Sequence, residues 1–193
     1  VPLVADMSSD IFSRNFDYSK FDLFYAGAQK NMGPAGTTLV LLKENIFGKV
    51  SRVIPSILDY SVHAKSGSMF NTPPVFAVYT SLLTLRWIES QGGIDSIGVK
   101  NTTKSKYLYD EIDRNSKFVG FAAEKDRSEM NATFNLVDPS LTESFNSLCE
   151  AAGISGLKGH RSVGGYRASI YNALPIESIE VLVTCMKNLE ENY

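Results

Sequence analysis

Cysteine, histidine and tryptophan are scarce in this sequence, and its charge is nearly balanced. The 193 residues include two cysteines, two histidines and one tryptophan. Lysine and arginine number 19 against 21 aspartates and glutamates, which leaves a formal net charge of −2. A chain with so balanced a charge lacks the electropositive field that attracts nucleic acid or an anionic membrane. We therefore expect neither as a partner.

The cysteines and histidines do not form a metal-binding pattern. Cys149 and Cys185 stand singly in stretches of helical pattern, with no Cys-x-x-Cys pair and no histidine at metal-ligand spacing. His63 and His160 are too few for a histidine-based metal centre. We expect two reduced thiols in a reducing compartment, and no metal.

Long apolar runs are also missing, and the first residues do not have the pattern of a signal peptide. No run approaches the roughly 20 apolar residues that span a bilayer, and the first four residues lack the basic start of a signal peptide. We therefore expect a cytoplasmic protein with no membrane partner. The chain starts with valine, and residues 1–5 have the pattern of a buried strand with nothing leading into it. This start predicts that the sequence is a fragment with a missing upstream piece.

What is present is typical of a globular chain of one domain or slightly more. Hydrophobic residues make up 44% and charged residues 21%, with 14 glycines and seven prolines. Up to about residue 90, apolar runs predict strands at 1–5, 21–25 and 37–42. A long helix is expected from Pro73 to Gly92, with Thr72 as its N-cap.

The rest of the chain has a mixed pattern of helices and strands. The spacing predicts a helix over 94–115, with Tyr107, Leu108 and Ile112 buried and its lysines facing outward. Strands are expected at 118–122, 130–137 and 166–171, and helices at 141–152 and 175–192. The boundary between a β-rich piece and a compact α+β piece is expected near residue 90.

Two residues in the first piece suit a particular chemistry. Asp6 follows the first strand, where ligands bind in open α/β sheets, and Lys30 lies in a loop rich in small residues between two strands. Each alone has an ordinary reading, as a turn former and as a solvated lysine. Together they match a pyridoxal phosphate enzyme, which needs a lysine to form a Schiff base and a carboxylate to keep the pyridine nitrogen protonated.

Four segments carry a resemblance to a known family. Residues 5–10, 25–36, 71–74 and 159–169 resemble, in this order, the phosphoserine aminotransferase family, and the similarity runs over essentially the whole chain. The resemblance implies an α/β protein. Residues 1–90 would be the C-terminal part of the large, cofactor-binding domain of a fold-type-I transferase, including its connecting helix. Residues 91–193 would be its α+β small domain.

The resemblance also implies an activity. The family moves an amino group between glutamate or 2-oxoglutarate and 3-phosphohydroxypyruvate or phosphoserine, with pyridoxal phosphate as cofactor, and it works as a homodimer. Its phosphate loop and ring-stacking aromatic residue come from an N-terminal half that has no counterpart in these residues. We expect the fragment alone to be inactive. Whether a phosphorylated hydroxythreonine is also a substrate stays open.

The resemblance assigns cofactor contacts to five residues. Lys30 matches the Schiff-base lysine, Asp6 the partner of the pyridine nitrogen, and Gln29 a residue that contacts the cofactor. Asn71 and Thr72 match a pair that reaches the cofactor phosphate of the neighbouring subunit. Amide and hydroxyl donors ahead of a helix N-terminus suit a phosphate group.

A glycine-rich block near the end resembles the family's anion-binding segment. His160, Arg161 and Arg167 match residues that bind the substrate's anionic groups, and an arginine grips carboxylate or phosphate with two hydrogen bonds. Two alternatives stay open, another fold-type-I aminotransferase and an inactive truncated interaction domain. The Gly-His-Arg block and the absence of a catalytic cysteine loop disfavour a cysteine desulfurase.

Overall fold

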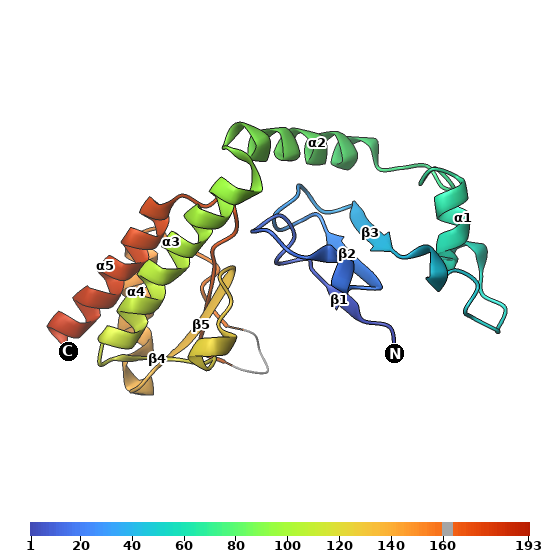
Figure 1. Cartoon of the computed structure of the whole chain (residues 1–193). Coiled ribbons are helices and arrows are strands. Elements are labelled where there is room, and N and C mark those ends of the chain that lie inside the picture. Colours follow the sequence, from blue (N-terminus) through green and yellow to red (C-terminus); the bar gives the residue numbers. More distant parts are fainter. Residues whose placement is uncertain (160–163) are drawn as a thin grey trace. The chain divides into compact units, whose positions relative to one another are not determined.

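The computed structural model describes residues 1–159 and 164–193. It divides the chain into two compact units, Val1–Ile94 and Asp95–Tyr193 (Figure 1). We describe each unit by itself.

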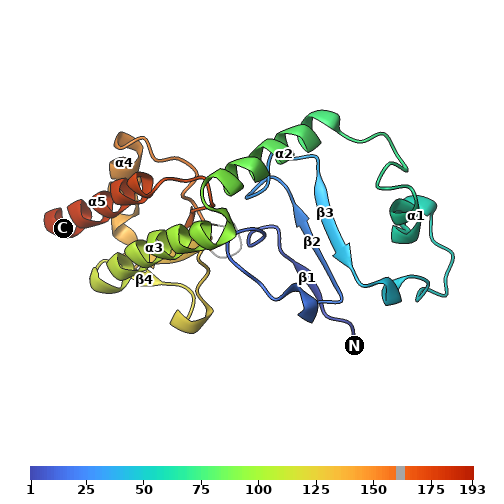
Figure 2. The same ribbon diagram turned by 45° about the horizontal axis from the view of Figure 1, so that its top comes forward.

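The first unit is built on a three-stranded mixed sheet. Its strands are β1 (Val4–Asp6), β2 (Leu23–Gly27) and β3 (Thr38–Leu42), which lie side by side in that order (Figure 2). β1 pairs with β2 in parallel, and β2 pairs with β3 antiparallel. This sheet positions two of the predicted site residues: Asp6 is the last residue of β1, and Lys30 lies in the loop that joins β2 to β3.

Residues 1–4 are exposed in this chain, although residues 1–5 have the pattern of a buried strand. The strand begins at Val4, whose side chain is 55% exposed, and Leu3 is also exposed. β1 lies at the edge of this sheet and pairs with one strand, so its side chains gain little cover. The apolar residues that enter the core, Met7 and Ile11, lie on the turn after the strand and pack with Phe24.

Short helical segments separate the sheet from one long helix. They are η2 (Glu44–Ile46), η3 (Ser56–Leu58) and α1 (Tyr60–Lys65), and the long helix is α2 (Val75–Ser90). A further short segment, η1 (Tyr18–Lys20), lies between β1 and β2. The sequence predicted Thr72 as the N-cap of helix α2. That prediction was wrong, because Pro74 occupies the N-cap position. A proline disfavours helical backbone in the residue before it, so two consecutive prolines delay the start of the helix to Val75.

Helix α2 packs against the loop after β2 through small residues. A Cβ atom added at Gly33 would meet Ser81 Oγ at 2.6 Å, and one added at Gly36 would meet the Ala77 Cβ at 3.3 Å. Ala77 and Ser81 are accordingly buried. Ile88 near the end of the helix is also buried, whereas six larger apolar side chains are exposed in this chain: Val75, Phe76, Val78, Tyr79, Leu82 and Leu83. No helix in the described residues is long and apolar enough to cross a membrane.

The second unit is an antiparallel sheet packed with helices. Its strands, in the order β4-β5-β6, are β4 (Phe118–Gly120), β5 (Asn131–Leu136) and β6 (Tyr166–Ser169). The helices are α3 (Gly93–Arg114), α4 (Thr142–Ala151) and α5 (Ile176–Asn192), with the short turns η4 (Glu124–Asp126) and η5 (Pro139–Leu141). The predicted helices and strands of this part are confirmed, with ends shifted by a few residues.

The core of this unit contains a group of aromatic rings. Phe134 and Tyr166 stack with their ring centroids 5.4 Å apart, and Phe145 of α4 meets Tyr166 edge to face at 5.0 Å. The core also holds the two cysteines, which are free thiols as predicted. Burial raises the pKa of the Cys149 thiol to about 12.

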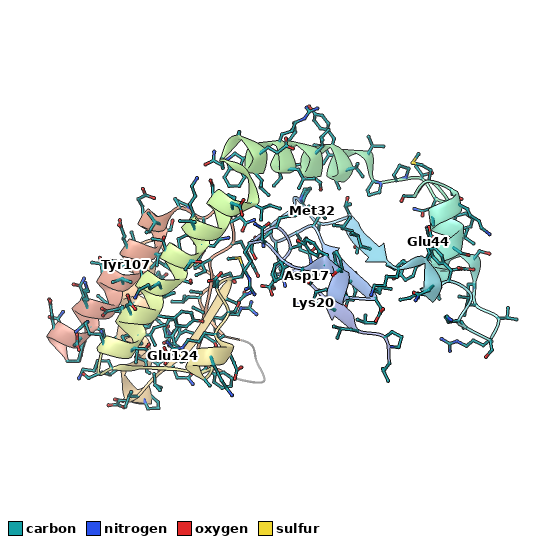
Figure 3. All side chains as sticks on the ribbon, in the orientation of Figure 1. Asp17, Lys20, Met32, Glu44, Tyr107 and Glu124 are labelled. Carbon is teal, nitrogen blue, oxygen red and sulfur yellow. The ribbon has the colours of Figure 1, made fainter. Side chains whose placement is uncertain are left out.

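Two predictions about α3 were wrong. Tyr107, labelled in Figure 3, is 39% exposed, because the buried side of the helix follows Leu108 and Ile112. Lys104, expected outside, is 3% exposed. Its Nζ donates hydrogen bonds to the carbonyl oxygens that follow β6, those of Ile170 (3.2 Å), Tyr171 (2.8 Å) and Leu174 (3.0 Å). Three acceptors match the three N–H groups of an ammonium, which lets this lysine be buried.

Candidate functional site

Asp6 stands at the end of β1 with its carboxylate held by the next turn. Asp6 Oδ1 accepts hydrogen bonds from the Ser8 backbone N–H (2.9 Å) and from the Ser8 hydroxyl (2.6 Å). These two hydrogen bonds stabilise the charged carboxylate and are the main reason that the pKa of Asp6 is lowered. The Tyr25 hydroxyl and the Lys30 amine lower this pKa further. Asp6 is therefore an ionised carboxylate at neutral pH.

Lys30 lies in the turn between β2 and β3, half-buried beside the same segment. Its Nζ donates a hydrogen bond to Ser9 Oγ over 2.9 Å. The neighbouring Asn31 side chain donates to the backbone oxygens of Ser9 (2.7 Å) and Ile11 (3.2 Å). The residues after β1 therefore hold the lysine loop in place: Lys30 contacts Ser9, and the adjacent Ser8 contacts Asp6.

Gln29 precedes the lysine and is exposed. Its side chain lies over Gly27, where an added Cβ would meet Gln29 Oε1 at 2.5 Å. The Ala28 backbone N–H donates to Thr37 O over 2.9 Å, so the start of the turn is tied to the start of β3. Glycine at position 27 thus leaves room for the Gln29 amide.

Asn71 and Thr72 belong to the same unit but to the segment before α2, and both are exposed. The Asn71 side chain donates to the Thr72 carbonyl over 3.2 Å. Asn71 also borders a cavity of about 550 Å³, together with Thr37, Tyr60 and His63. The structure therefore leaves the donors of this pair at the surface of the unit.

In the second unit, Arg167 is exposed on β6, where it is paired with Thr133 of β5. It borders a cavity of about 210 Å³. His160 and Arg161, the other two predicted anion-binding residues, lie outside the described residues. Gly165 has φ +62°, and a Cβ there would overlap Asn135 Oδ1, so this position accepts only glycine without rearrangement.

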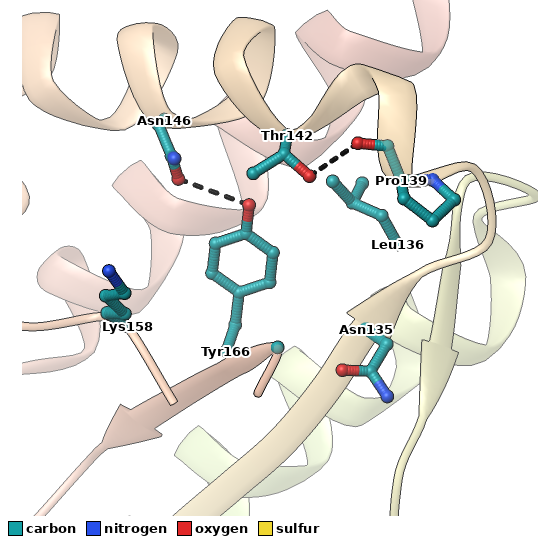
Figure 4. Close-up of a pocket in the computed structure, with 8 residues that line it drawn as sticks. Asn135, Leu136, Pro139, Thr142, Asn146, Lys158 and Tyr166 are labelled. Carbon is teal, nitrogen blue, oxygen red and sulfur yellow. Dashed lines mark hydrogen bonds between the residues drawn. The ribbon is translucent and has the colours of Figure 1, made fainter. Parts of the chain in front are cut away.

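The second unit also contains a larger cavity of about 660 Å³, which no pattern in the sequence predicted. It lies between α4, the end of β5 and the start of β6 (Figure 4). The Tyr166 hydroxyl donates to Asn146 Oδ1 over 3.2 Å, and the Thr142 hydroxyl donates to Pro139 O over 2.7 Å.

Within the described residues, no group of three or more His, Cys, Asp or Glu could hold a metal ion.

Sequence reasoning missed the roles of two consecutive serines in this site. Ser8 contacts Asp6 and Ser9 contacts Lys30. The signal that could have found Ser8 is the Asp-x-Ser pattern, in which the aspartate side chain bonds the backbone N–H two residues on. For Ser9 the sequence holds no such signal, because its partner is far away in the chain.

The fold agrees with the comparisons to known proteins. The family model of the class-V aminotransferases matches residues 1–182, and the chain belongs to this family.

Within the family, it is similar to curated phosphoserine aminotransferases. One from Flavobacterium johnsoniae is 66% identical over 190 residues, covering 98% of this chain and 53% of the relative. One from Bacteroides fragilis is 53% identical over 193 residues, covering 99% of this chain and 54% of the relative. The chain therefore spans about half the length of the curated relatives it matches.

Solved structures give the same result. The phosphoserine aminotransferase of Bacillus circulans subsp. alkalophilus superposes with a TM-score of 0.94 at 45% identity, covering 100% of this chain and 54% of that one. A phosphoserine aminotransferase from Trichomonas vaginalis, described as bound to PLP, gives 0.90 at 37% identity, covering 97% and 54%. The expected α/β fold of the fold-type-I aminotransferases is confirmed.

Proposed function

We propose that the protein containing this chain is a phosphoserine aminotransferase that uses pyridoxal phosphate. The observation that carries the proposal is the group of Asp6 and Lys30, held by consecutive serines at the ends of two neighbouring strands. The similarity to phosphoserine aminotransferases at 53–66% identity supports this choice within the family. In this proposal residues 1–90 belong to the large domain and residues 91–193 form the small domain.

The donor set of the first unit fits the cofactor. A carboxylate whose pKa is lowered stays anionic, which suits a protonated pyridine nitrogen, and Lys30 offers a primary amine in the same unit. When bound, pyridoxal phosphate supplies an electron sink for the bonds to the substrate's α-carbon. Asp6 would hold the proton on the ring nitrogen, and Lys30 would bond the cofactor and carry a proton to and from the substrate's α-carbon.

The other predicted residues would bind and orient. Gln29, whose amide lies over Gly27, is proposed to contact the cofactor. Asn71 and Thr72 offer exposed donors, which we propose reach the cofactor phosphate of a second subunit in a homodimer. Arg167, with His160 and Arg161, is proposed to bind the anionic groups of phosphoserine, 3-phosphohydroxypyruvate, glutamate and 2-oxoglutarate. The cytoplasmic location stays a prediction.

The proposal is tested with a Lys30→Ala variant of the full-length gene product. The wild-type protein, incubated with pyridoxal phosphate, should show the visible absorption band of the lysine-bound cofactor, and the variant should lack it. Transamination between phosphoserine and 2-oxoglutarate should fall by at least about 10²–10⁴-fold, since the proton-carrying amine is lost.

Lys20→Ala is the matched control, because Lys20 is an exposed lysine of the same unit, with a 74% exposed side chain. It should keep both the band and the activity. Near wild-type turnover in Lys30→Ala, or a wild-type protein that neither binds pyridoxal phosphate nor transaminates phosphoserine, would show that the proposed function is wrong.

A further inference from the structure

A local turn recurs along this chain, in which an aspartate accepts a hydrogen bond from the backbone N–H of a serine two residues later. At Asp17 and Ser19 the distance is 3.2 Å, and at Asp59 and Ser61 it is 2.8 Å. In these cases the aspartate is the N-cap of a helical turn, which is the usual use of such a contact. The same turn at Asp6 instead follows a strand.

The turn at Asp6 has an additional connection to the neighbouring strand. The Ser8 hydroxyl donates to Asp6 Oδ1 over 2.6 Å and accepts the Gly27 backbone N–H over 3.0 Å. Gly27 is the last residue of β2, and the loop that follows carries Lys30. One hydroxyl therefore ties the carboxylate at the end of β1 to the backbone from which the lysine loop departs.

This arrangement fixes one oxygen of the carboxylate. Both Ser8 donors converge on Oδ1, so the Ser8 contacts leave Oδ2 for other partners. The other groups that act on Asp6 are the Tyr25 hydroxyl of β2 and the Lys30 amine, and both lower the pKa of Asp6 less than the Ser8 hydroxyl does. Ser8 is thus the main support of the charged carboxylate.

Building on the proposed function, we propose that Ser8 is a positioning residue for the cofactor. Its hydroxyl holds the Asp6 carboxylate in one orientation against the end of β2, so that the carboxylate is ready for the pyridine nitrogen. Ser8 itself needs no contact with the cofactor or the substrate for this role. The role predicts an effect on cofactor affinity that passes through Asp6.

The test uses Ser8→Ala in the full-length gene product freed of cofactor, titrated with pyridoxal phosphate and followed by intrinsic fluorescence. The Kd should rise about tenfold, the loss expected when a charge-assisted hydrogen bond is removed. Ser8→Thr keeps a hydroxyl and should bind within about twofold of the wild type. Ser19→Ala removes the hydroxyl from the equivalent turn at Asp17, where Ser19 Oγ also bonds the carboxylate, and should leave the Kd unchanged.

The pH profile separates this role from a merely structural one. Cofactor affinity should fall as the pH drops through the pKa of Asp6, since a protonated carboxyl no longer pairs with the pyridinium. Loss of the Ser8 hydroxyl raises the pKa of Asp6, so in Ser8→Ala this fall should begin at higher pH than in the wild type. A merely structural role would raise the pH of acid unfolding of the cofactor-free protein, followed by circular dichroism in the same buffers, and the affinity midpoint would move with that unfolding rather than apart from it.

A Ser8→Ala variant with the same Kd and the same pH midpoint as Ser19→Ala would overturn the inference. Failure of the proposed function has a different signature, because the wild-type protein would then show no band of lysine-bound cofactor, or Lys30→Ala would keep it. In that case the role of Ser8 falls with the proposed function.

Discussion

Replacing Lys104 by methionine removes a buried ammonium while keeping most of its aliphatic stem. In the wild type this ammonium lies 2.8–3.2 Å from the carbonyl oxygens of Ile170, Tyr171 and Leu174. The side chain is 3% exposed, so water cannot replace the lost donors without opening the unit. The substitution therefore tests how α3 holds the segment between β6 and α5.

The size of the effect follows from two opposing contributions. A hydrogen bond to a charged group contributes about 1.5–3 kcal/mol, so three of them contribute roughly 4.5–9 kcal/mol. Burial opposes this and lowers the pKa of Lys104 from 10.5 to about 8. That difference is equivalent to about 3 kcal/mol of cost for the buried charge. We expect Lys104→Met to lower the free energy of unfolding by about 3 kcal/mol at neutral pH.

The pH dependence has a definite sign. Above a pH of about 8 the folded protein releases the Lys104 proton, whereas the unfolded chain keeps it up to its ordinary pKa of 10.5. Where the unfolded state binds more protons, stability rises with pH. The wild type should therefore gain up to about 3 kcal/mol relative to Lys104→Met between these two pKa values.

Urea unfolding of the full-length gene product, followed by circular dichroism from neutral pH to about pH 10, measures both effects. Lys106→Met is the matched control, because Lys106 lies on the same helix with a 69% exposed side chain bound to Asp110. It should change the free energy by less than about 1 kcal/mol at every pH. If Lys104→Met matched this control at neutral pH, or if its curve stayed parallel to that of the wild type as the pH rose, the reasoning would be refuted.

Three further predictions concern the second unit. Gly165→Ala should destabilise the protein by about 1–3 kcal/mol more than Gly156→Ala in urea unfolding, because both have positive φ but only position 165 lacks room for a Cβ; equal losses would contradict this. Arg167→Ala should raise the KM for phosphoserine about ten- to a hundredfold and that for serine much less; an equal rise would exclude a role in binding phosphate. Cys149 and Cys185, both buried, should react with a disulfide reagent only after denaturation, and rapid labelling of the native protein would show otherwise.

The element order was predictable wherever one face of an element is buried. In β5 the alternation of Ala132, Phe134 and Leu136 with polar residues matches their burial in the structure, because side chains of a strand point to opposite faces in turn. Helix α5 was predictable for the same reason, with Ile179 and Met186 on its buried side. Helix α2 was recognised as a helix, but its apolar residues lie all around it, so the sequence did not show which side packs against the loop after β2.

The misses have a common physical cause. The burial of Lys104 depends on carbonyl groups almost 70 residues later in the chain, which no local pattern reveals. Asp6 and Lys30 were singled out by their places after a strand and in a loop of small residues, and the family resemblance then assigned their roles. Ser8 was missed because its second partner belongs to another strand.

The parallel pairing of β1 with β2 has a consequence for how the lengths of related chains vary. Asp6 is paired with Tyr25, and a slip of one residue would turn either side chain to the opposite face of the sheet. Insertions and deletions are therefore expected in the connections, such as residues 12–20 and 43–58, where the chain can absorb them at the surface. Between Asp6 and Ser8, and between Gly27 and Lys30, the spacing should stay constant among relatives, even where the residues themselves change.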